Sequence, residues 1–341
     1  MRCPWCPPSP ADGDTSGMST AAHRERSRDD PGAELIAAHS VLDLVGNTPL
    51  VEIRAVRDGI ADDVRLFAKL EGFNPGGSVK DRPAKKMIEA GLAAGKLVPG
   101  KTILDSTSGN TGIGLAMVGA ALGFAVKLVM PENVSVERKR VIRAYGAEIV
   151  FSDPMEGSDG AIRLCRKILA EDPERYFKPD QYNNPANPLA HYEGTGPEIW
   201  RQTEGRVTHF VAAIGTSGTI MGTGRYLKEQ NPAIQVVAAE PEDAFHGLEG
   251  LKHMASSIVP GIYHETELDL KIGIATDDAY NMVYRLGREE GLIVGQSCGA
   301  AHLAALEVAR ALTTGTIVTI FPDFGDRYLS TNLWLGWQRL P

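Results

Sequence analysis

The sequence has few aromatic residues, no long apolar run and no excess of positive charge. Phe, Trp and Tyr together make up 6% of the 341 residues. No stretch of about 18 consecutive apolar residues occurs, so we expect no membrane-spanning helix and no membrane partner. The net charge is −8, with Lys and Arg scattered along the chain. This distribution predicts no nucleic-acid partner.

Cysteine is also scarce, with four residues in the chain. Cys165 and Cys298 are isolated and indicate reduced thiols in a cytoplasmic protein. Cys3 and Cys6 form one C-P-W-C, which without a second pair supports neither a metal nor a redox site, so we predict no metal. Residues 1–34 are rich in Pro, Asp, Arg, Ser and Gly and have no apolar core segment. We therefore predict a disordered tail rather than a secretory signal.

Glycine is abundant, with 37 residues, many of them directly after apolar runs. From about residue 35, strand and helix patterns alternate. The predicted strands cover residues 102–106, 126–130, 147–151, 208–214, 235–240 and 316–321. One helix is predicted after Lys80, from the apolar spacing at Ala84, Met87, Ile88 and Leu92, and another is opened by the glycine loop within 107–123. Further predicted helices cover 135–146, 159–172, 219–230, 277–290 and 300–312. This alternation predicts an α/β fold with parallel sheets covered by helices. The Asn-, Pro- and Gly-rich stretch 180–199 is the predicted junction between two domains.

One motif is formally a nucleotide-binding loop. "GKLVPGKT" (Gly95 to Thr102) matches G-x-x-x-x-G-K-[ST]. That loop requires a strand before it and a helix after it, whereas here a predicted helix precedes and a strand follows. We interpret Lys101 as a surface residue. The chain also lacks a G-x-G-x-x-G followed by an acidic residue, so a dinucleotide site is not supported.

Two other glycine loops lie between a predicted strand and a predicted helix. "TSGNTG" (Thr107 to Gly112) has side chains suited to a carboxylate, and "GTSGT" (Gly215 to Thr219) suits a phosphate. A helix start presents backbone N–H groups and a positive dipole end to an anion. Each loop alone is equally well explained as a plain glycine turn. Their occurrence together favours two anion sites.

A lysine and a third helix start complete the predicted site. Lys80 follows the turn of "EGFNPGGSVKDRPA" (Glu71 to Ala84), and Ser297-Cys298-Gly299 opens another helix. A phosphate site together with a positioned amine suggests a phosphorylated carbonyl cofactor held by Lys80. Asp81 and Arg82 are expected to fix the start of the helix after Lys80.

Seven motifs then occur in a familiar order. They are "GNTPL", "NPGGSVKDRPA", "TSGNTG", "MPENVSVER", "QYNNPAN", "GTSGTIMGTGRYLKE" and "GQSCGAA". Together they resemble the cysteine synthase and cystathionine β-synthase family over residues 41–330, and "MPENVSVER" and "HYEGTGPEIW" resemble its cysteine synthase B type. The resemblance implies the tryptophan synthase β-like fold (PLP fold type II), with two three-layer α/β/α domains. It implies domains at 35–182 (smaller and mobile) and 183–341, with part of 41–70 packed on the second.

The resemblance also implies roles for individual residues. Lys80 matches the lysine that forms a Schiff base with pyridoxal 5'-phosphate and moves the substrate's α-proton. Asn110 matches the partner of the cofactor's ring hydroxyl, and Ser297 matches the partner of its ring nitrogen. The phosphate loop would be formed by Gly215, Thr216, Ser217, Gly218 and Thr219, and the clamp on the substrate's carboxylate by Thr107, Ser108, Thr111 and Gln181.

The implied reaction is β-replacement on an activated L-serine, with sulfide or a related sulfur donor giving L-cysteine. Members that use O-phosphoserine read the phosphate with an arginine in the segment that is "AAEPEDAFHGLEGLKHM" here. That segment has Lys252 as its only cation, so O-acetylserine is favoured. The alternatives are another nucleophile, as in cystathionine or diaminopropionate synthesis, or a cofactor-free binding protein of the same fold, against which the intact Lys80, Asn110 and Ser297 argue. A cytoplasmic homodimer is expected.

Two further motifs receive structural interpretations. Cys298 replaces the Ser or Thr that is usual in the family's turn, and we interpret it as a packing substitution. "PDFGDRYLS" (Pro322 to Ser330) resembles the family's closing strand and loop and is predicted to be structural.

Overall fold

The computed structural model describes residues 38–107 and 109–336. The predicted disordered tail at 1–34, with Cys3 and Cys6, and the predicted carboxylate ligand Ser108 lie outside the described residues. The following account concerns the unit that begins at His39.

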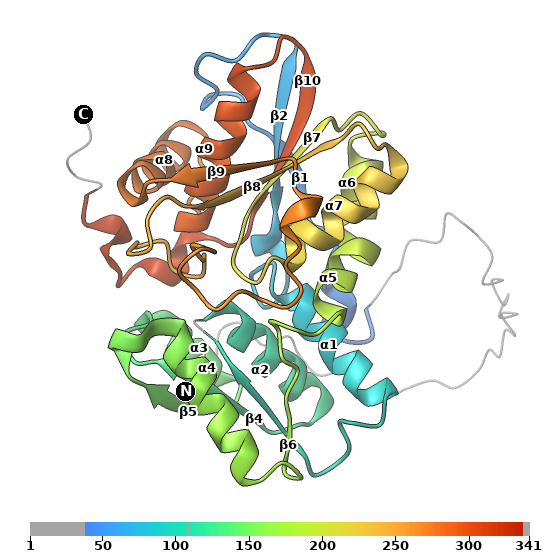
Figure 1. The fold of residues 1–341 in the computed structure, drawn as a ribbon, viewed down its shortest axis with the longest axis vertical. Helices are drawn as coiled ribbons and strands as arrows, with labels where there is room; N and C mark the ends of the chain where they lie inside the picture. The colour runs from blue at the N-terminus through green and yellow to red at the C-terminus, as the bar shows by residue number, and fades with distance from the viewer. Residues whose placement is uncertain (1–37, 108, 337–341) are drawn as a thin grey trace, which may run out of the picture. The chain divides into compact units, whose positions relative to one another are not determined.

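The larger of two sheets has six strands in the order β1-β2-β10-β7-β8-β9 (Figure 1). Only β1 pairs antiparallel with its neighbour, and the other pairs are parallel. The strands are Leu50–Glu52 (β1), Val64–Leu70 (β2), Gly315–Phe321 (β10), His209–Ala213 (β7), Gln235–Pro241 (β8) and Leu270–Ile274 (β9). This sheet thus joins an early segment of the chain to its last strand.

The second sheet has four parallel strands in the order β5-β4-β3-β6. They are Glu148–Ser152 (β5), Val126–Pro131 (β4), Thr102–Ser106 (β3) and Tyr176–Phe177 (β6). All four come from one continuous part of the chain, interleaved with helices. The sequence patterns predicted β3, β4 and β5 to within one residue at each end.

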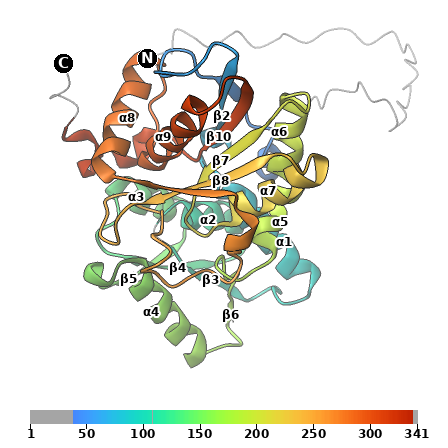
Figure 2. The ribbon, with the colours of Figure 1, turned by 45° about the horizontal axis from the view of Figure 1, so that its top comes forward.

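Helices cover both faces of each sheet, as parallel strands require. The helices are Asp81–Ala93 (α1), Asn110–Leu122 (α2), Val136–Ala144 (α3), Gly157–Glu171 (α4), Ala186–Ala190 (α5), Gly196–Gln202 (α6), Gly218–Gln230 (α7), Thr276–Glu289 (α8) and Gln296–Arg310 (α9). Figure 2 shows α4 on one side of the four-stranded sheet and α2 and α3 on the other. In Figure 1, α8 and α9 lie on one side of the six-stranded sheet and α6 and α7 on the other. None of the described helices is both long and apolar enough to cross a membrane.

Alternating residues of the strands fill separate cores. In β7, Val211 packs in the core beneath α8 and α9, whereas Phe210 and Ala212 pack in the core beneath α6 and α7. In β4, Leu128 packs in the core on one face of the smaller sheet, and Val129 packs in the core on the other face. This period of two is what a strand covered on both sides produces, and it gives the three-layer arrangement predicted for each sheet.

Strands β1, β2, β6 and β9 were not predicted, and two helical segments also differ from the sequence predictions. The stretch 180–199, for which no helix was predicted, is helical from Ala186: α5 passes through a π-helical turn, His191–Thr195, directly into α6. Pro188 lies in the first turn of α5, where no backbone N–H is needed, and Pro197 follows directly on the irregular π-helical turn. Helix α9 begins at Gln296, four residues before its predicted start, so Ser297 lies in its first turn.

A buried cluster of four charges joins the six-stranded sheet to α1 and α6. Lys69 of β2 lies 2.8 Å from Glu198 of α6, and Arg82 of α1 lies 2.7 Å from both Glu198 and Glu71. Burial would raise the pKa of Glu198, but the hydrogen bond and charge of Arg82 outweigh it and lower that pKa to about 2. Arg82 therefore anchors the helix that follows Lys80, as its position in the sequence predicted.

Candidate active site

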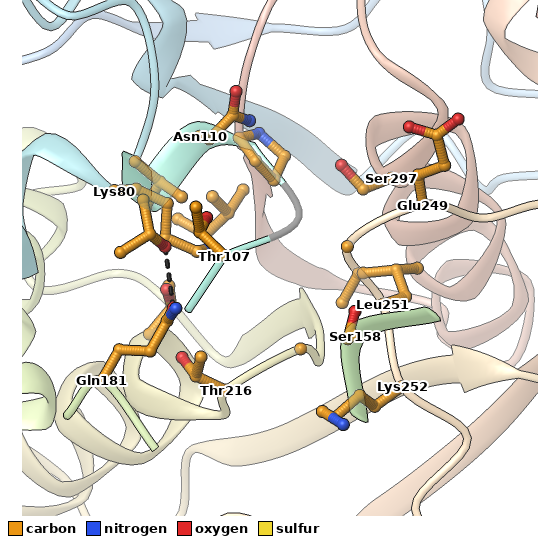
Figure 3. Close-up of a pocket in the computed structure, with 18 of the residues that line it drawn as sticks. Lys80, Thr107, Asn110, Ser158, Gln181, Thr216, Glu249, Leu251, Lys252 and Ser297 are labelled. Atoms are coloured by element: carbon orange, nitrogen blue, oxygen red, sulfur yellow. Dashed lines mark hydrogen bonds between the residues drawn. The ribbon is translucent and has the colours of Figure 1, made fainter. Parts of the chain in front are cut away.

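One cavity brings together most of the predicted site residues. Those that line it are Lys80, Thr107, Asn110, Thr111, Gln181, Gly215, Thr216, Thr219 and Ser297. Ser217 and Gly218 belong to the same loop as Gly215 but do not line the cavity. Figure 3 shows Lys80, Thr107 and Asn110 on one side of the cavity and Ser297 on the other. Residues more than 200 positions apart in the chain therefore meet at one place.

The turn before Lys80 is fixed at several points. Gly77 has φ +81°, a conformation that glycine adopts without strain. The backbone N–H of Gly76 donates to Asp81 Oδ2 at 2.6 Å. The N–H of Val79 donates to the carbonyl of Pro322, just past β10, at 2.8 Å. Asp81 thus stabilises the turn before its helix, in line with its predicted role at the helix start. The hydrogen bond to Pro322, just past β10, fixes the position of the backbone directly before Lys80.

The Lys80 amine is the reactive group of the cavity. Within the described residues, Lys80 Nζ has neither a hydrogen-bond nor an ion-pair partner. Burial lowers the pKa of Lys80 below its usual value, and the charge of Asp323 opposes this only in part. A lysine with a lowered pKa spends more time as the neutral, nucleophilic amine.

The second glycine loop leads from β7 into α7. A Cβ at Gly215 would lie 2.2 Å from the carbonyl oxygen of Gly250, and one at Gly218 would lie 1.9 Å from Asn187 Oδ1. Ser217 has φ +70°, and its buried Oγ has no hydrogen-bond partner among the described residues. The loop thus combines a helix start, closely packed glycines and an unsatisfied hydroxyl, which together suit an anion.

The first glycine loop leads from β3 into α2. Thr107 Oγ1 accepts from the backbone N–H groups of Gly109 at 3.0 Å and Gly112 at 3.2 Å. Thr111 Oγ1 donates to Gln181 Oε1 at 2.8 Å, and Gln181 Nε2 donates to the Ser106 carbonyl at 2.7 Å. Three of the predicted carboxylate ligands are therefore bonded to their own surroundings.

Asn110 is part of a network that the sequence did not predict. Its Nδ2 donates to Asp323 Oδ2 at 2.5 Å, and its Oδ1 accepts from Arg327 at 3.0 Å. The hydroxyl of Tyr328 donates to the same carboxylate oxygen at 2.5 Å. An amide nitrogen carries two hydrogens, so Asn110 retains one donor for a ligand.

Several cavity residues were missed, although their motifs were quoted. Arg138, of "MPENVSVER", and Tyr328, of "PDFGDRYLS", both line the cavity. Tyr328 thus gives the closing motif a place in the site besides its predicted structural role. Glu249 and Lys252 follow β8 and lie on the Ser297 side in Figure 3. Arg138 and Glu249 form an ion pair of 2.7 Å, which requires the fold and could not be seen in the sequence.

Cys298 lies beside Ser297 but faces the core. Its side chain is fully buried among α8 and the six-stranded sheet, and Sγ lies 3.4 Å from the carbonyl oxygen of Asp323. Burial raises the pKa of the Cys298 thiol well above its usual value. A thiol in this setting packs rather than reacts, which agrees with the predicted packing substitution.

Comparison with known proteins identifies the family. The sequence model described as "Pyridoxal-phosphate dependent enzyme" matches residues 41–323. A cysteine synthase of Aquifex aeolicus is 55% identical over 87% of this chain and 92% of its own length. Cysteine synthase B of Pseudomonas aeruginosa is 44% identical over 86% of this chain and 97% of its own. The chain belongs to the cysteine synthase family of pyridoxal-phosphate dependent enzymes.

A solved structure supports the same assignment. The crystal structure of a cysteine synthase from Entamoeba histolytica matches with a TM-score of 0.84 at 38% identity, covering 94% of each chain. The predicted fold class, family and cofactor are therefore confirmed.

The residues present suit pyridoxal phosphate. Gly215, Thr216 and Thr219 line the cavity at the start of α7, where closely packed glycines and a helix start suit a phosphate, and within the described residues the neighbouring Ser217 Oγ has no partner. The amine of Lys80, which has no partner in the part of the chain that the structure describes, is suited to a carbonyl. Ser297, with a neutral hydroxyl, lies on the opposite wall from Lys80. A phosphate, a carbonyl and a ring nitrogen are thus each matched by a group of the appropriate chemistry.

Proposed function

We propose that this enzyme replaces the acetoxy group of O-acetyl-L-serine with the sulfur of sulfide, giving L-cysteine and acetate. The observation that carries the proposal is the Lys80 amine, which has no partner among the described residues and lies in a cavity bounded by two candidate anion loops. The cysteine synthases described above support this choice of reaction.

The proposed cofactor site uses residues from both walls. Pyridoxal phosphate supplies a carbonyl that joins to amines and a ring that withdraws electrons from the substrate's α-carbon. Lys80 would hold the carbonyl carbon, Ser297 the ring nitrogen and Asn110 the ring oxygen. The loop from Gly215 to Thr219 would hold the phosphate, through Gly215, Thr216, Ser217, Gly218 and Thr219.

The proposed substrate site is the first loop. Thr107, Ser108, Thr111 and Gln181 would bind the carboxylate of the amino acid, with Thr111 and Gln181 exchanging their mutual hydrogen bond for bonds to the substrate. Lys80, once its amine is released, would take the proton from the substrate's α-carbon and later return one. Its lowered pKa suits this work, because the neutral amine is the form that accepts a proton.

The charges in the cavity favour a neutral leaving-group ester. Besides Lys80, the cations that line it are Arg138 and Lys252, and both are paired with acidic residues. Neither offers an unneutralised charge to a phosphate. Lys252, the cation noted in the sequence, lies 3.3 Å from Asp159 of α4. O-Acetylserine is therefore favoured over O-phosphoserine.

One set of assays tests the proposal. The purified protein, loaded with pyridoxal phosphate, is offered O-acetylserine, O-phosphoserine or serine against sulfide, thiosulfate and homocysteine, and the kcat/KM values are ranked. We expect O-acetylserine with sulfide to rank first. A first rank for homocysteine would assign the enzyme to cystathionine synthesis instead. A colourless protein whose spectrum does not change on adding cofactor would refute the whole proposal.

The same proposal includes a cytoplasmic homodimer and movement of the smaller domain. The first loop belongs to the four-stranded sheet and the second to the six-stranded sheet, so a substrate that binds the first and reacts above the second would draw them together. Small-angle scattering with and without a substrate analogue measures this closure, and the absolute forward scattering gives the oligomeric state. Identical profiles would count against closure.

A further inference from the structure

The cavity contains an ion pair that none of the proposed catalytic roles uses. Arg138 Nη1 lies 2.7 Å from Glu249 Oε2, and both residues line the cavity. The side chain of Arg138 is 3% exposed and that of Glu249 is 35% exposed. The carboxylate is therefore the more solvent-accessible member of the pair.

Arg138 is held in place independently of Glu249. Its stem packs on the first loop, where a Cβ at Gly109 would lie 2.4 Å from Arg138 Cδ. Its guanidinium lies 4.5 Å from the centre of the Tyr328 ring, and the hydroxyl of Tyr328 is bonded to Asp323. A planar guanidinium fixed in this way is the group best suited to bind a phosphate through two parallel hydrogen bonds. In this structure, Glu249 forms an ion pair with that guanidinium and neutralises its charge.

We infer that Glu249 is a specificity-determining residue, which excludes phosphate-bearing amino acids by neutralising Arg138 and repelling a second anion. The inference rests on the proposed function, since it concerns which activated serine enters the same cavity. A serine phosphate carries a charge close to −2 at neutral pH and faces the carboxylate of Glu249, whereas an acetyl ester is neutral and meets no like charge.

The reaction is the same for either substrate. The Cβ–O bond breaks, and the oxygen leaves with the bonding electrons as acetate or as inorganic phosphate. Hydrosulfide forms the new Cβ–S bond with its own electron pair and keeps its proton, so the product is the thiol. Glu249 would act on the choice of leaving group and not on these steps.

The test compares Glu249 with Asp159, the carboxylate paired with Lys252, which also lines the cavity. Glu249→Gln removes the charge but keeps an oxygen that can accept from Arg138, and Asp159→Asn makes the matched change at the ion pair of Lys252. For each holoenzyme we compare kcat/KM for O-phospho-L-serine with kcat/KM for O-acetyl-L-serine, both with sulfide. Like charges placed together cost several kcal/mol, so this ratio should rise about tenfold or more in Glu249→Gln and much less in Asp159→Asn. Arg138→Gln added to Glu249→Gln should remove the gain.

Direct binding provides a second measurement. Titration with O-phospho-L-serine, followed by the absorption band of the bound cofactor, should show tighter binding to Glu249→Gln than to the unmodified enzyme. Glu249→Ala serves if the glutamine variant does not fold, as judged by thermal melting. An unchanged ratio in a folded variant, or an equal rise in Asp159→Asn, would overturn the inference. If the unmodified enzyme fails to use O-acetylserine, the proposed function fails instead, so the two failures are distinguishable.

Discussion

The two glycine loops share one pattern, in which a buried strand runs into a glycine turn and then a helix, but their hydrogen bonds differ. In the first loop, Thr107 accepts from two backbone N–H groups and Thr111 is bonded to Gln181. In the second loop, Thr216 Oγ1 accepts from Asn187 and Thr219 Oγ1 lies 3.3 Å from His191 Nε2, but the buried Oγ of Ser217 has no partner among the described residues. The described hydroxyls of the first loop are all bonded within the protein, whereas the second loop keeps one that is not.

This difference fits the two ligands that we propose. A cofactor that stays bound through many turnovers suits a site that needs no rearrangement. A substrate must bind and leave in every turnover. A site whose internal hydrogen bonds are exchanged for bonds to the substrate suits this, because binding is then coupled to a change in the loop. The following predictions test this contrast, beginning with the largest expected effect.

Lys80→Ala should leave both loops intact while abolishing turnover. The amine is the only group proposed to move the α-proton, and losing such a group costs about 10²–10⁴-fold in rate. Turnover of O-acetylserine and sulfide gives the rate, and mass spectrometry after borohydride reduction tests for covalent cofactor in the unmodified enzyme and its loss in the variant. Undiminished turnover in Lys80→Ala would mean that the reaction does not depend on this lysine.

Gly218→Ala should damage the second loop selectively. The added Cβ would lie 1.9 Å from Asn187 Oδ1, so the loop or Asn187 must move. Overpacking of this kind costs about 1–3 kcal/mol, which corresponds to a cofactor Kd raised roughly tenfold or more. Dialysis followed by cofactor absorbance measures the loss. Gly287→Ala is a matched control, because Gly287 is also a helical glycine without a positive φ, and the nearest atom to its Cβ position, Ile293 Cγ1, lies 4.0 Å away. Equal cofactor loss in both variants would show that the effect is not local.

Thr111→Val should damage the first loop selectively. It removes the hydroxyl that is bonded to Gln181 without changing the shape of the side chain. We expect the KM for O-acetylserine to rise about tenfold, the value of one lost hydrogen bond, with the cofactor content unchanged. Thr111→Ser, which keeps the hydroxyl, should restore most of the affinity. Loss of cofactor from Thr111→Val would erase the distinction between the loops.

A buried histidine that contacts the second loop should make the free energy of unfolding of the protein depend on pH. His191 Nε2 lies 3.3 Å from Thr219 Oγ1, and burial, with a contribution from the charge of Arg82, lowers the pKa of His191 to about 3. In the unfolded chain the imidazole binds a proton near pH 6.5, whereas the folded protein resists protonation. The free energy of unfolding should therefore fall as the pH drops from about 6.5 toward 3, by on the order of 3 kcal/mol near pH 4. Little should change at pH 7.

Denaturant unfolding at a series of pH values measures this slope. His191→Gln, whose amide can still contact Thr219, should show a smaller slope between pH 6.5 and 4 than the unmodified protein. Equal slopes in both proteins would mean that His191 does not set the acid sensitivity.

Local patterns in the sequence were sufficient for most elements of the fold. The apolar spacing at Ala84, Met87 and Ile88 predicted α1, and these three residues are fully buried. The strand β9, with only two buried residues, Ile272 and Ile274, gave too weak an alternation to be recognised. The helical run from Ala186 was missed because its prolines and glycines predict loops, and their tolerance depends on packing against α7 that no local pattern contains.

The site divides in the same way. Lys80, the two loops and Ser297 lie in short motifs with the context that their chemistry needs, so the sequence could identify them. The pair of Arg138 and Glu249 and the bond between Asn110 and Asp323 join residues far apart in the chain. These contacts depend on how the two sheets are packed. All of these residues could be read in the sequence, but the sequence could not show that they lie next to one another in the fold.

The buried cluster of Lys69, Glu71, Arg82 and Glu198 has a consequence for how this sequence can diverge. Its two positive and two negative charges compensate one another in the interior. Removing one partner of a buried pair costs about 3–5 kcal/mol, a large part of the stability of a typical protein, whereas replacing a whole cluster with apolar residues can be neutral. Descendants of this sequence should therefore keep all four residues or lose them together. An alignment of the family would show these positions changing as a group.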